Sequence, residues 1–432
     1  MGLVKRLLVK ESIPAIQQIL IAGIAWLIGY PLTYLLKRKQ GLTVVIGRKG
    51  DVFSDNSKYY FILATQNAKS DERVVFLTNS RPIHEAILDA GGMAVLQPSW
   101  LSLWLILRCD ILVTDMAEWF NYGAYQLSRG AKLIQIWHGA PLKHIELDVY
   151  RKRLSDMSFW MRSLLLLHKR FIGRYPNYDV VVATSQKFID TAFSSSFYAK
   201  RFIPCGYPRN DILLGWPQQN RVTDALLKVN VDESAIKVVQ RAKENSKKIC
   251  LYVPTFRKDL TDPFGGGLNL AGLSEFASLK NILIVLKQHP AMQGRNSVSQ
   301  YENLVEYGAL KDVYPAMIYC DVLITDYSSI YFDFLLLDRP IVFFAPDLDD
   351  YLKNDRDMYF DYEKMTPGKK CYRYAELERQ LEVILNNNGE DAYSDKRAEI
   401  RNYTYDFCDN QSGRRLLQAV CDNDVILKSS AV

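Results

Sequence analysis

Two histidines stand where acid–base chemistry could take place. His138 follows the apolar run KLIQIW (132–137) and precedes a glycine. His289 ends the run ILIVLKQHP (282–290) at a comparable point of the second half, directly before a proline. A lone histidine at such a point is more often structural. Because imidazole titrates near neutral pH without any perturbation, two of them at matched strand ends favour general acid and base groups.

The stretch ITDYSSIYFDFLLLDRP (324–340) places Asp326, Ser328 and Ser329 where a buried strand ends and a helix begins. One interpretation is a helix cap, in which a serine side chain accepts a hydrogen bond from the first turn. The other is an anion site, because the free N–H groups and the positive end of the helix dipole attract a phosphate. The two hydroxyl groups would then add donors to that phosphate.

A further strand end, LYVPTFRKD (251–259), carries Thr255 and Arg257, and the guanidinium could meet a second phosphate oxygen in bidentate fashion. Metal interpretations are weaker, since His138 and His144 lack a usual ligand spacing and DLDD (347–350) is typical of a solvated loop. The sequence has no Walker, G-x-G-x-x-G or G-x-S-x-G motif, which removes the main support for ATPase, dinucleotide and hydrolase functions. We expect neither a metal nor a cofactor.

Two sets of short apolar runs, separated by helical stretches, must position these residues. This alternation is typical of parallel sheets covered on both faces. DILVTD (110–115) and DVLITD (321–326) share D-x-L-x-T-D, a faint internal echo that agrees with two similar folds. The expected strands are 42–47, 73–78, 93–96, 110–115, 132–137 and 179–184 in the first half, and 247–256, 282–290, 321–326 and 340–346 in the second.

The predicted class is therefore α/β, with two Rossmann-like, doubly wound parallel-sheet domains. Ligands of such sheets bind at the carboxyl ends of the strands, here in a cleft between the domains. We expect a hydrophobic segment over residues 1–40, an N-terminal Rossmann-like domain over 41–210 and a C-terminal Rossmann-like domain over 211–425. GYPRNDIL (206–213) is the expected hinge.

Composition sets the broad class and the compartment. The chain has 432 residues, 48% of them hydrophobic, and a net charge of +6, which suits an anionic ligand or a membrane surface but is no nucleic-acid signature. Its seven cysteines are scattered without a C-x-x-C pair. Reduced thiols in a cytoplasmic body are the consequence we expect.

The N-terminal stretch SIPAIQQILIAGIAWLIGYPLTYLL (12–36) carries no charge and is long enough to span a bilayer. Basic residues flank both ends, so orientation stays open, and Pro14 and Pro31 would also allow a re-entrant hairpin. A buried core helix is the alternative. SFWMRSLLLLHKRFIGRYP (158–176) could lie in a membrane interface or pack into the first domain. We expect association with the cytoplasmic membrane, with the body on its cytoplasmic face.

The strand-end motifs WHGAPLK, VPTFRKD, LKQHP, ITDYSSIYFDF, DRPIVFF and MYFDYEKMTPG resemble, in this order, those of the CDP-glycerol glycerophosphotransferases. These enzymes are the polymerases and primases of teichoic acids and related polyol-phosphate capsules. The resemblance covers about residues 130–380. It implies a GT-B-like fold and transfer of a polyol phosphate, foremost glycerol phosphate, from a CDP-linked donor to a hydroxyl of a lipid-linked acceptor, with release of CMP.

The same resemblance implies roles for individual residues. His138 would be the general base on the acceptor hydroxyl, and His289 would stabilise or protonate the departing phosphate. The substrate-binding set would comprise Trp137, Gly139, Lys143, Thr255, Arg257, Asp326, Ser328, Ser329 and Asp333, with the two serines on the donor diphosphate. A GT-B glycosyltransferase that uses a nucleotide-sugar remains the alternative enzyme, and a membrane-tethered binding module the alternative without turnover. The choice between glycerol, ribitol or another polyol stays open, as does that between primase and polymerase.

Overall fold

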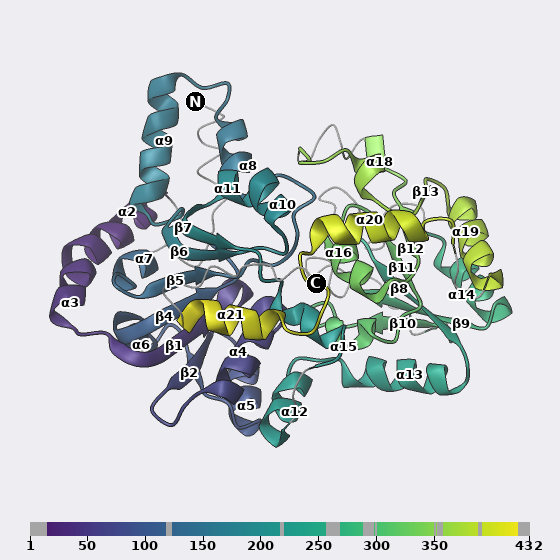
Figure 1. Ribbon diagram of the computed structural model, residues 1–432, viewed down its shortest axis with the longest axis horizontal. Coiled ribbons are helices and arrows are strands. Elements are labelled where there is room, and N and C mark those ends of the chain that lie inside the picture. Colours follow the sequence, from purple (N-terminus) through teal and green to yellow (C-terminus); the bar gives the residue numbers. More distant parts are fainter. Residues whose placement is uncertain are drawn as a thin grey trace.

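The computed structural model describes residues 15–117, 123–216, 220–255, 268–287, 298, 300–349, 351, 357–387 and 391–421. Within these ranges the chain forms two β-sheets that lie side by side, each with helices on both faces (Figure 1). The first sheet has the strand order β3-β2-β1-β4-β5-β6-β7 and the second β10-β9-β8-β11-β12-β13. Neighbouring strands pair in parallel throughout, for example β1 with β4 and β8 with β11. The predicted class, α/β with two Rossmann-like domains, is confirmed.

We call the parts built around the two sheets the first and the second domain. The strands of the first sheet are β1 (Lys39–Ile46), β2 (Arg73–Thr78), β3 (Ala94–Leu96), β4 (Cys109–Thr114), β5 (Lys132–Gln135), β6 (Asn177–Val182) and β7 (Tyr198–Ile203). Those of the second sheet are β8 (Lys248–Val253), β9 (Ile282–Lys287), β10 (Leu304–Tyr307), β11 (Val322–Thr325), β12 (Ile341–Phe344) and β13 (Lys369–Cys371).

Helices connect these strands. Up to β7 they are α2 (Ala15–Ile24), η1 (Ala25–Gly29), α3 (Tyr30–Leu35), η2 (Arg48–Gly50), α4 (Asp55–Asn67), α5 (Arg81–Asp89), α6 (Trp100–Arg108), α7 (Ala124–Leu127), α8 (Glu146–Arg153), α9 (Phe159–Phe171), α10 (Gln186–Phe188), η4 (Ile189–Phe193) and α11 (Ser194–Ser196). After β7 they are η5 (Pro208–Ile212), α12 (Arg221–Lys228), α13 (Glu233–Glu244), α14 (Leu270–Leu279), α15 (Tyr314–Met317), α16 (Ile330–Phe334), η7 (Leu335–Leu337), α18 (Tyr362–Met365), α19 (Tyr374–Asn386), α20 (Ser394–Thr404) and α21 (Ser412–Cys421).

The two sheets repeat one topology. In each, the first strand in sequence pairs on one side with the second and on the other side with the fourth, so β1 corresponds to β8 and β4 to β11. The D-x-L-x-T-D echo lies on β4 and β11, the two corresponding central strands. In such sheets the strand order reverses between the first and fourth strands, and the crevice at their carboxyl ends is where ligands bind.

Three strands of the described sheets, β7, β10 and β13, were not among the predicted runs, and all three are edge strands. β7 (YAKRFI) carries two charged side chains and β13 (KKC) two lysines. An edge strand has one open side and does not need the continuous apolar run of a central parallel strand. The apolar pattern therefore predicted the central strands of both sheets and missed three of the four edge strands.

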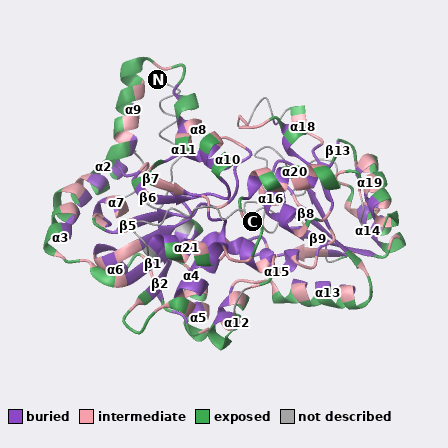
Figure 2. Ribbon diagram, in the orientation of Figure 1, coloured by how far each residue is buried: buried purple, intermediate pink, exposed green. Residues whose placement is uncertain are grey.

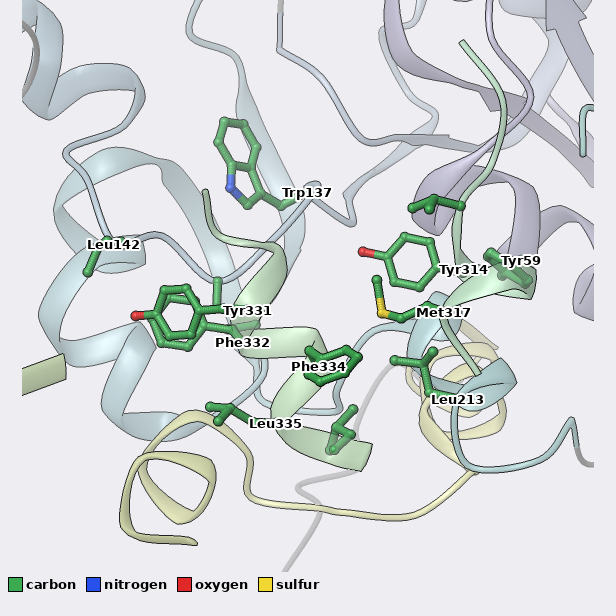
Figure 3. Close-up of a cluster of buried hydrophobic side chains, with 14 of the residues drawn as sticks. Tyr59, Trp137, Leu142, Leu213, Tyr314, Met317, Tyr331, Phe332, Phe334 and Leu335 are labelled. Atoms are coloured by element: carbon green, nitrogen blue, oxygen red, sulfur yellow. The ribbon is translucent and has the colours of Figure 1, made fainter. Parts of the chain in front are cut away.

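The two domains share one apolar core at their interface. A single cluster of buried side chains contains residues of both sheets, and Figure 3 shows its centre between the domains. Trp137 and Leu142 enter it from the segment after β5, and Tyr314 and Met317 from α15. Figure 2 shows the same continuity, with buried residues running from one sheet into the other. A shared core fixes the relative position of the carboxyl ends of both sheets.

The chain returns to the first domain at its end. Helix α21 packs against α4, and its Leu416 and Val420 belong to the same core cluster as Val45 and Phe61. The carboxylate of Asp211 accepts hydrogen bonds from the main-chain N–H groups of Ser412 (2.9 Å) and Gly413 (2.8 Å), where α21 begins. Burial raises the pKa of Asp211 to about 7. The domain boundaries expected at residues 40 and 210 remain predictions.

The N-terminal apolar segment forms one continuous helical stretch, α2–η1–α3, which we call the N-terminal helix. Its part Ile16–Leu35 is long and apolar enough to cross a bilayer. The middle, η1, is a π-helical turn in which the N–H of Tyr30 donates to the carbonyl of Ala25. Pro31 follows at once, and a proline without an N–H disturbs the regular ladder in this way. The described part of the segment makes no hairpin reversal.

Candidate active site

The turn after β5 carries the first predicted catalytic residue. His138 is half-buried, and its Nδ1 lies 3.0 Å from the main-chain oxygen of Asp115, at the end of the neighbouring strand β4. A carbonyl oxygen can only accept a hydrogen bond, so Nδ1 carries the proton. Nε2 is then the nitrogen that can take up a proton, as a general base requires.

The backbone of this turn is unusual on both sides of the histidine. Trp137 has a φ of +46° and Gly139 a φ of +150°. A positive φ is costly for a bulky residue and persists only where the surroundings impose it. Here Asn56 imposes it, because its Nδ2 donates to the carbonyl oxygens of Ile136 (3.2 Å) and Trp137 (2.9 Å).

Trp137 itself is 4% exposed, with its ring against those of Phe197 (centroids 5.0 Å apart) and His138 (4.0 Å). It was predicted to bind substrate, and in the structure its side chain lies in the shared core (Figure 3), with one side of its ring against the imidazole. In this position it supports the imidazole ring from behind.

The turn after β11, in the second domain, holds the predicted serines. Ser329 occupies the N-cap position of α16, but its side chain makes no capping hydrogen bond. Ser328 and Ser329 are both half-exposed. The capping interpretation therefore does not account for Ser329, whose hydroxyl stays at the surface of the turn.

Asp326 organises this turn from within. It is 1% exposed, and its carboxylate accepts hydrogen bonds from the main-chain N–H of Thr255 (2.9 Å) and from Thr255 Oγ1 (2.6 Å). Tyr362 donates from its hydroxyl to the main-chain oxygen of Asp326 (3.2 Å). The ends of β8 and β11 are thereby joined, which brings Thr255 to the same edge of the sheet as the two serines.

The two turns meet at the interface of the domains. A methyl group built on Gly139 would lie 3.1 Å from Oγ of Ser329 and 3.3 Å from Nη2 of Arg209. A side chain here would crowd both atoms, and the φ of +150° at Gly139 further disfavours any residue other than glycine. The structure thus brings the Trp-His-Gly motif of the first domain against the double serine of the second.

Arg209 lies behind this contact and was not singled out from the sequence. Its Nη1 donates to the main-chain oxygen of His138 (2.9 Å) and to Asp55, and its Nη2 donates to Asp333 (2.7 Å). Asp333, predicted to bind substrate, is 1% exposed and also accepts a hydrogen bond from the hydroxyl of Tyr314 (2.7 Å). It is therefore a partner of the buried arginine, and it lies behind the surface of the site.

Lys143 reaches across the interface at another point. Its ammonium donates to the hydroxyl of Tyr351 (2.6 Å), whose ring stacks on that of Tyr327 with centroids 3.9 Å apart. The backbone of Lys143 pairs with Met358 of the second domain. Two main-chain hydrogen bonds flank this isolated bridge: His144 N–H donates to Asp357 O, and Tyr359 N–H donates to Leu142 O. The MYFDYEK motif thus packs against the segment that follows the histidine.

Two predicted residues, His289 and Arg257, lie outside the described residues, so the expected meeting of two imidazoles stays a prediction. β9 ends at Lys287, whose ammonium donates to the carbonyl oxygens of Gly308, Ala309 and Lys311. Burial lowers the pKa of Lys287 to about 7. Among the described residues, His, Cys, Asp and Glu form no group of three that could hold a metal ion.

Asp115 is a second feature that sequence reasoning missed. Its side chain is completely buried, Oδ2 accepts from Ser57 Oγ (2.8 Å), and Oδ1 has no hydrogen-bond partner in the described part of the chain. Burial, together with the nearby charge of Asp55, raises the pKa of Asp115 to about 8. The available signal was the echo, because Asp115 corresponds to Asp326 at the end of the matching strand.

Fold and site together define a two-domain, GT-B-like enzyme with a histidine-bearing turn on one domain and a serine-bearing turn on the other. The chain matches the family described as CDP-Glycerol:Poly(glycerophosphate) glycerophosphotransferase over residues 28–422. It is 28% identical over 345 residues to the teichoic acid poly(glycerol phosphate) polymerase of Bacillus spizizenii, which covers 77% of this chain and 81% of that protein.

Identity to the teichoic acid ribitol-phosphate primase of the same organism is 24% over 380 residues, covering 87% of this chain and 89% of that protein. A solved structure of a variant of the wall teichoic acid polymerase TagF, soaked with CDPG, covers 97% of this chain and 95% of that one, with a TM-score of 0.68 and 20% identity. At this identity the likeness concerns the fold. The chain belongs to the CDP-glycerol:poly(glycerophosphate) glycerophosphotransferase family and is a transferase.

Proposed function

We propose that this protein transfers glycerol phosphate from CDP-glycerol to a hydroxyl group of a lipid-linked polyol-phosphate acceptor and releases CMP. The observation that carries the proposal is the close approach of the Gly139 backbone to Ser329, which sets the His138 turn beside the double serine. The first supplies a base for a hydroxyl, and the second supplies donors for a phosphate.

In the proposed reaction the acceptor oxygen attacks the phosphorus atom that bears glycerol. A new P–O bond forms, the P–O bond to the CMP oxygen breaks, and the proton of the acceptor hydroxyl passes to Nε2 of His138. CMP leaves with the bridging oxygen and its electron pair. Phosphoryl transfer depends mainly on positioning and on neutralising charge at the phosphate oxygens. Ser328 and Ser329 would serve this on the donor side, with His289 and Arg257 in the same roles as the family resemblance implies. Thr255 would act indirectly, because its N–H and hydroxyl hold Asp326 beneath the serine turn.

The polyol is the finer part of the proposal. The relatives in the comparison are named for glycerol phosphate and for ribitol phosphate, and the family description names glycerophosphotransfer. The relative named for glycerol phosphate has the higher identity, which favours CDP-glycerol as donor. A nucleotide-sugar glycosyltransferase is the alternative to test, because it would use the same kind of two-domain cleft.

We further propose that the first domain docks on the cytoplasmic membrane surface, where a lipid-linked acceptor is found. The N-terminal helix, α6 and α9 lie along the outer edge of this domain, on the left of Figures 1 and 2. Each presents large apolar side chains to solvent, among them Leu27 (80% exposed), Trp100 (88%) and Trp160 (80%). Exposed aromatic and aliphatic groups of this kind are typical of helices that lie in a membrane interface.

The packing of the N-terminal helix supports a helix that lies in the plane of the membrane surface, in preference to a helix that spans the bilayer. The indole N–H of Trp26 donates to the carbonyl of Phe171, at the end of α9 (3.0 Å), and a methyl group built on Gly29 would meet Leu127 of α7 at 2.5 Å. A helix held along its length by its own domain would carry that domain into the bilayer if it crossed. The buried free thiols of the body, such as Cys250 and Cys320, suit a cytoplasmic location.

The experiment uses purified full-length protein with each of CDP-glycerol, CDP-ribitol and a nucleotide-sugar, and follows nucleotide release by chromatography in the presence of acceptor. Wild-type protein should release CMP from CDP-glycerol. His138→Ala should lower the rate by about 10²-fold or more. His84→Ala, on the remote helix α5, is the matched control and should change the rate little. Release of a nucleoside diphosphate from the sugar donor, or full activity of His138→Ala, would contradict the proposal.

A further inference from the structure

Arg209 contacts both halves of the site at once. On the first domain its Nη1 donates to the main-chain oxygen of His138 (2.9 Å) and to Asp55, and on the second its Nη2 donates to Asp333 (2.7 Å). Its side chain is 3% exposed. Because the donors of a guanidinium form a rigid planar fork, one side chain fixes the positions of all these acceptors relative to one another.

The acceptors of this fork are close to the reacting groups on either side. On the first domain one acceptor is the main-chain oxygen of His138, the predicted base, and the other is the carboxylate of Asp55. On the second domain Asp333 lies one helical turn after Ser329, and one turn of α16 is too short to move independently of its own start. The guanidinium of Arg209 therefore sets the distance between the His138 turn and the serine turn. Gly139, which has no side chain, lets these two turns lie close together.

A second buried ion pair crosses the same interface without touching either turn. Nζ of Lys58, on α4, lies 2.8 Å from Oδ2 of Asp312 in the second domain, and its remaining donors go to the carbonyl oxygens of Leu227 and Val229. The hydroxyl of Tyr59 also donates to Asp312 (2.8 Å). Two buried pairs thus hold the domains together, and one of them also contacts the backbone of the predicted base.

We propose that Arg209 is a positioning residue of the transfer reaction, whose guanidinium holds the His138 turn in register with the Ser328–Ser329 turn. This rests on the proposed function. The base then faces the acceptor hydroxyl at the moment when the donor phosphate lies against the serines. A displacement of about 1 Å in such an arrangement lowers the rate by about 10²-fold. Donor binding to the second domain does not depend on this register.

The test compares Arg209→Lys and Asp333→Asn with Asp312→Asn in the full chain. For each variant, kcat is measured by CMP release, the Kd of CDP-glycerol by calorimetry, and Tm by thermal unfolding. Arg209→Lys keeps the charge but loses the fork. We expect its kcat to fall by about 30-fold or more, with the Kd changed by less than about 3-fold. Asp312→Asn should lower Tm to a similar extent and leave kcat within about 3-fold.

Milder variants keep the test decisive where these proteins fold poorly. Tyr314→Phe removes one hydroxyl bond to Asp333, and Tyr59→Phe removes one to Asp312, so the two changes are chemically alike. Only Tyr314→Phe should lower kcat. Equal losses of kcat at the two carboxylates, or a Kd that weakens in step with kcat, would overturn the positioning role. A wild-type protein that releases no CMP from any CDP-polyol contradicts the proposed function itself, and with it any role of Arg209 in this reaction.

Discussion

Asp115 ends the central strand β4 with a carboxyl group that no water reaches. Its main-chain oxygen orients His138, while its side chain faces the hydroxyl of Ser57 and the charges of Asp55 and Arg48. With a pKa of about 8, the carboxyl group carries a proton at neutral pH.

The raised pKa of Asp115 predicts a pH-dependent stability. The folded state binds a proton up to about pH 8, whereas the unfolded chain releases it near the ordinary value of 3.8. The stabilisation is therefore complete below pH 3.8 and is lost as the pH rises to about 8. Asp115→Asn removes this dependence. The free energy of unfolding of the variant, relative to wild type, should rise by up to about 1.4 kcal/mol per pH unit between about pH 5 and 8 and then level off.

Urea unfolding at a series of pH values measures this difference. Asp110→Asn, at the other end of the same strand and half-exposed, is the control and should not reproduce the trend. A difference between Asp115→Asn and wild type that stays constant with pH would mean that Asp115 does not hold its proton in the folded protein.

From the sequence we could predict the site residues that directly follow apolar strands. We could not predict the charged residues that are buried in other parts of the fold. His138, Thr255 and the double serine were identified because parallel strands carry functional residues at their carboxyl ends. Arg209 stands in a polar segment with glycine and proline, which has the composition of a surface hinge. That segment folds into the buried 3₁₀ helix η5, because its charges are paired across the domain interface. Such pairing depends on residues far away in sequence and leaves no local pattern.

At the scale of elements, central strands could be predicted from the sequence, whereas most edge strands could not. The interior strands of both sheets follow from apolar runs, whereas β7, β10 and β13 are short or charged and form because a neighbour offers its open edge. The N-terminal helix was foreseen as apolar, but its contacts with α7 and α9 were not, since helix-to-helix packing of small residues has no signature in hydropathy. These contacts leave its opposite, apolar face to solvent.

This exposed face predicts binding to lipid. Leu27→Glu, Trp104→Glu and Trp160→Glu, combined in one variant, place a charge on each of the three edge helices. Burying a large apolar side chain contributes about 1.5–3 kcal/mol, so partitioning onto vesicles of phosphatidylglycerol and phosphatidylcholine should fall at least about tenfold. Flotation in a density gradient measures it.

Leu279→Glu is the matched control, because Leu279 is equally exposed (77%) but lies on α14 of the second domain. It should leave flotation unchanged. Equal loss in both variants, or none in the triple variant, would contradict docking through this edge.

At the scale of the whole molecule, the two domains are connected at several places. The shared core, the two buried ion pairs and the pairing of Lys143 with Met358 all cross the interface. Helix α21 crosses it once more and completes the core of the first domain. The protein should therefore unfold as one cooperative unit despite its two sheets.

A substitution in α21 tests this connection. Leu416 is fully buried, and Leu416→Ala should lower the free energy of unfolding by about 2–5 kcal/mol, because a cavity is left between α21 and α4. Gln418→Ala, on the exposed side of the same helix, should change it by less than about 0.5 kcal/mol. Denaturant titration gives both values. A Leu416→Ala effect as small as that of the control would contradict the packing of α21 on the first domain.

The return of α21 also constrains the order in which this protein can be made. Leu416 and Val420 belong to the apolar interior that encloses Val45 and Phe61, so the earliest-synthesised sheet lacks part of its covering until α21 has left the ribosome. The first domain therefore cannot complete its folding when its own sheet has been synthesised, because it still lacks α21. During that interval its uncovered surface must wait for α21, which begins at Ser412, 366 residues after β1 ends at Ile46.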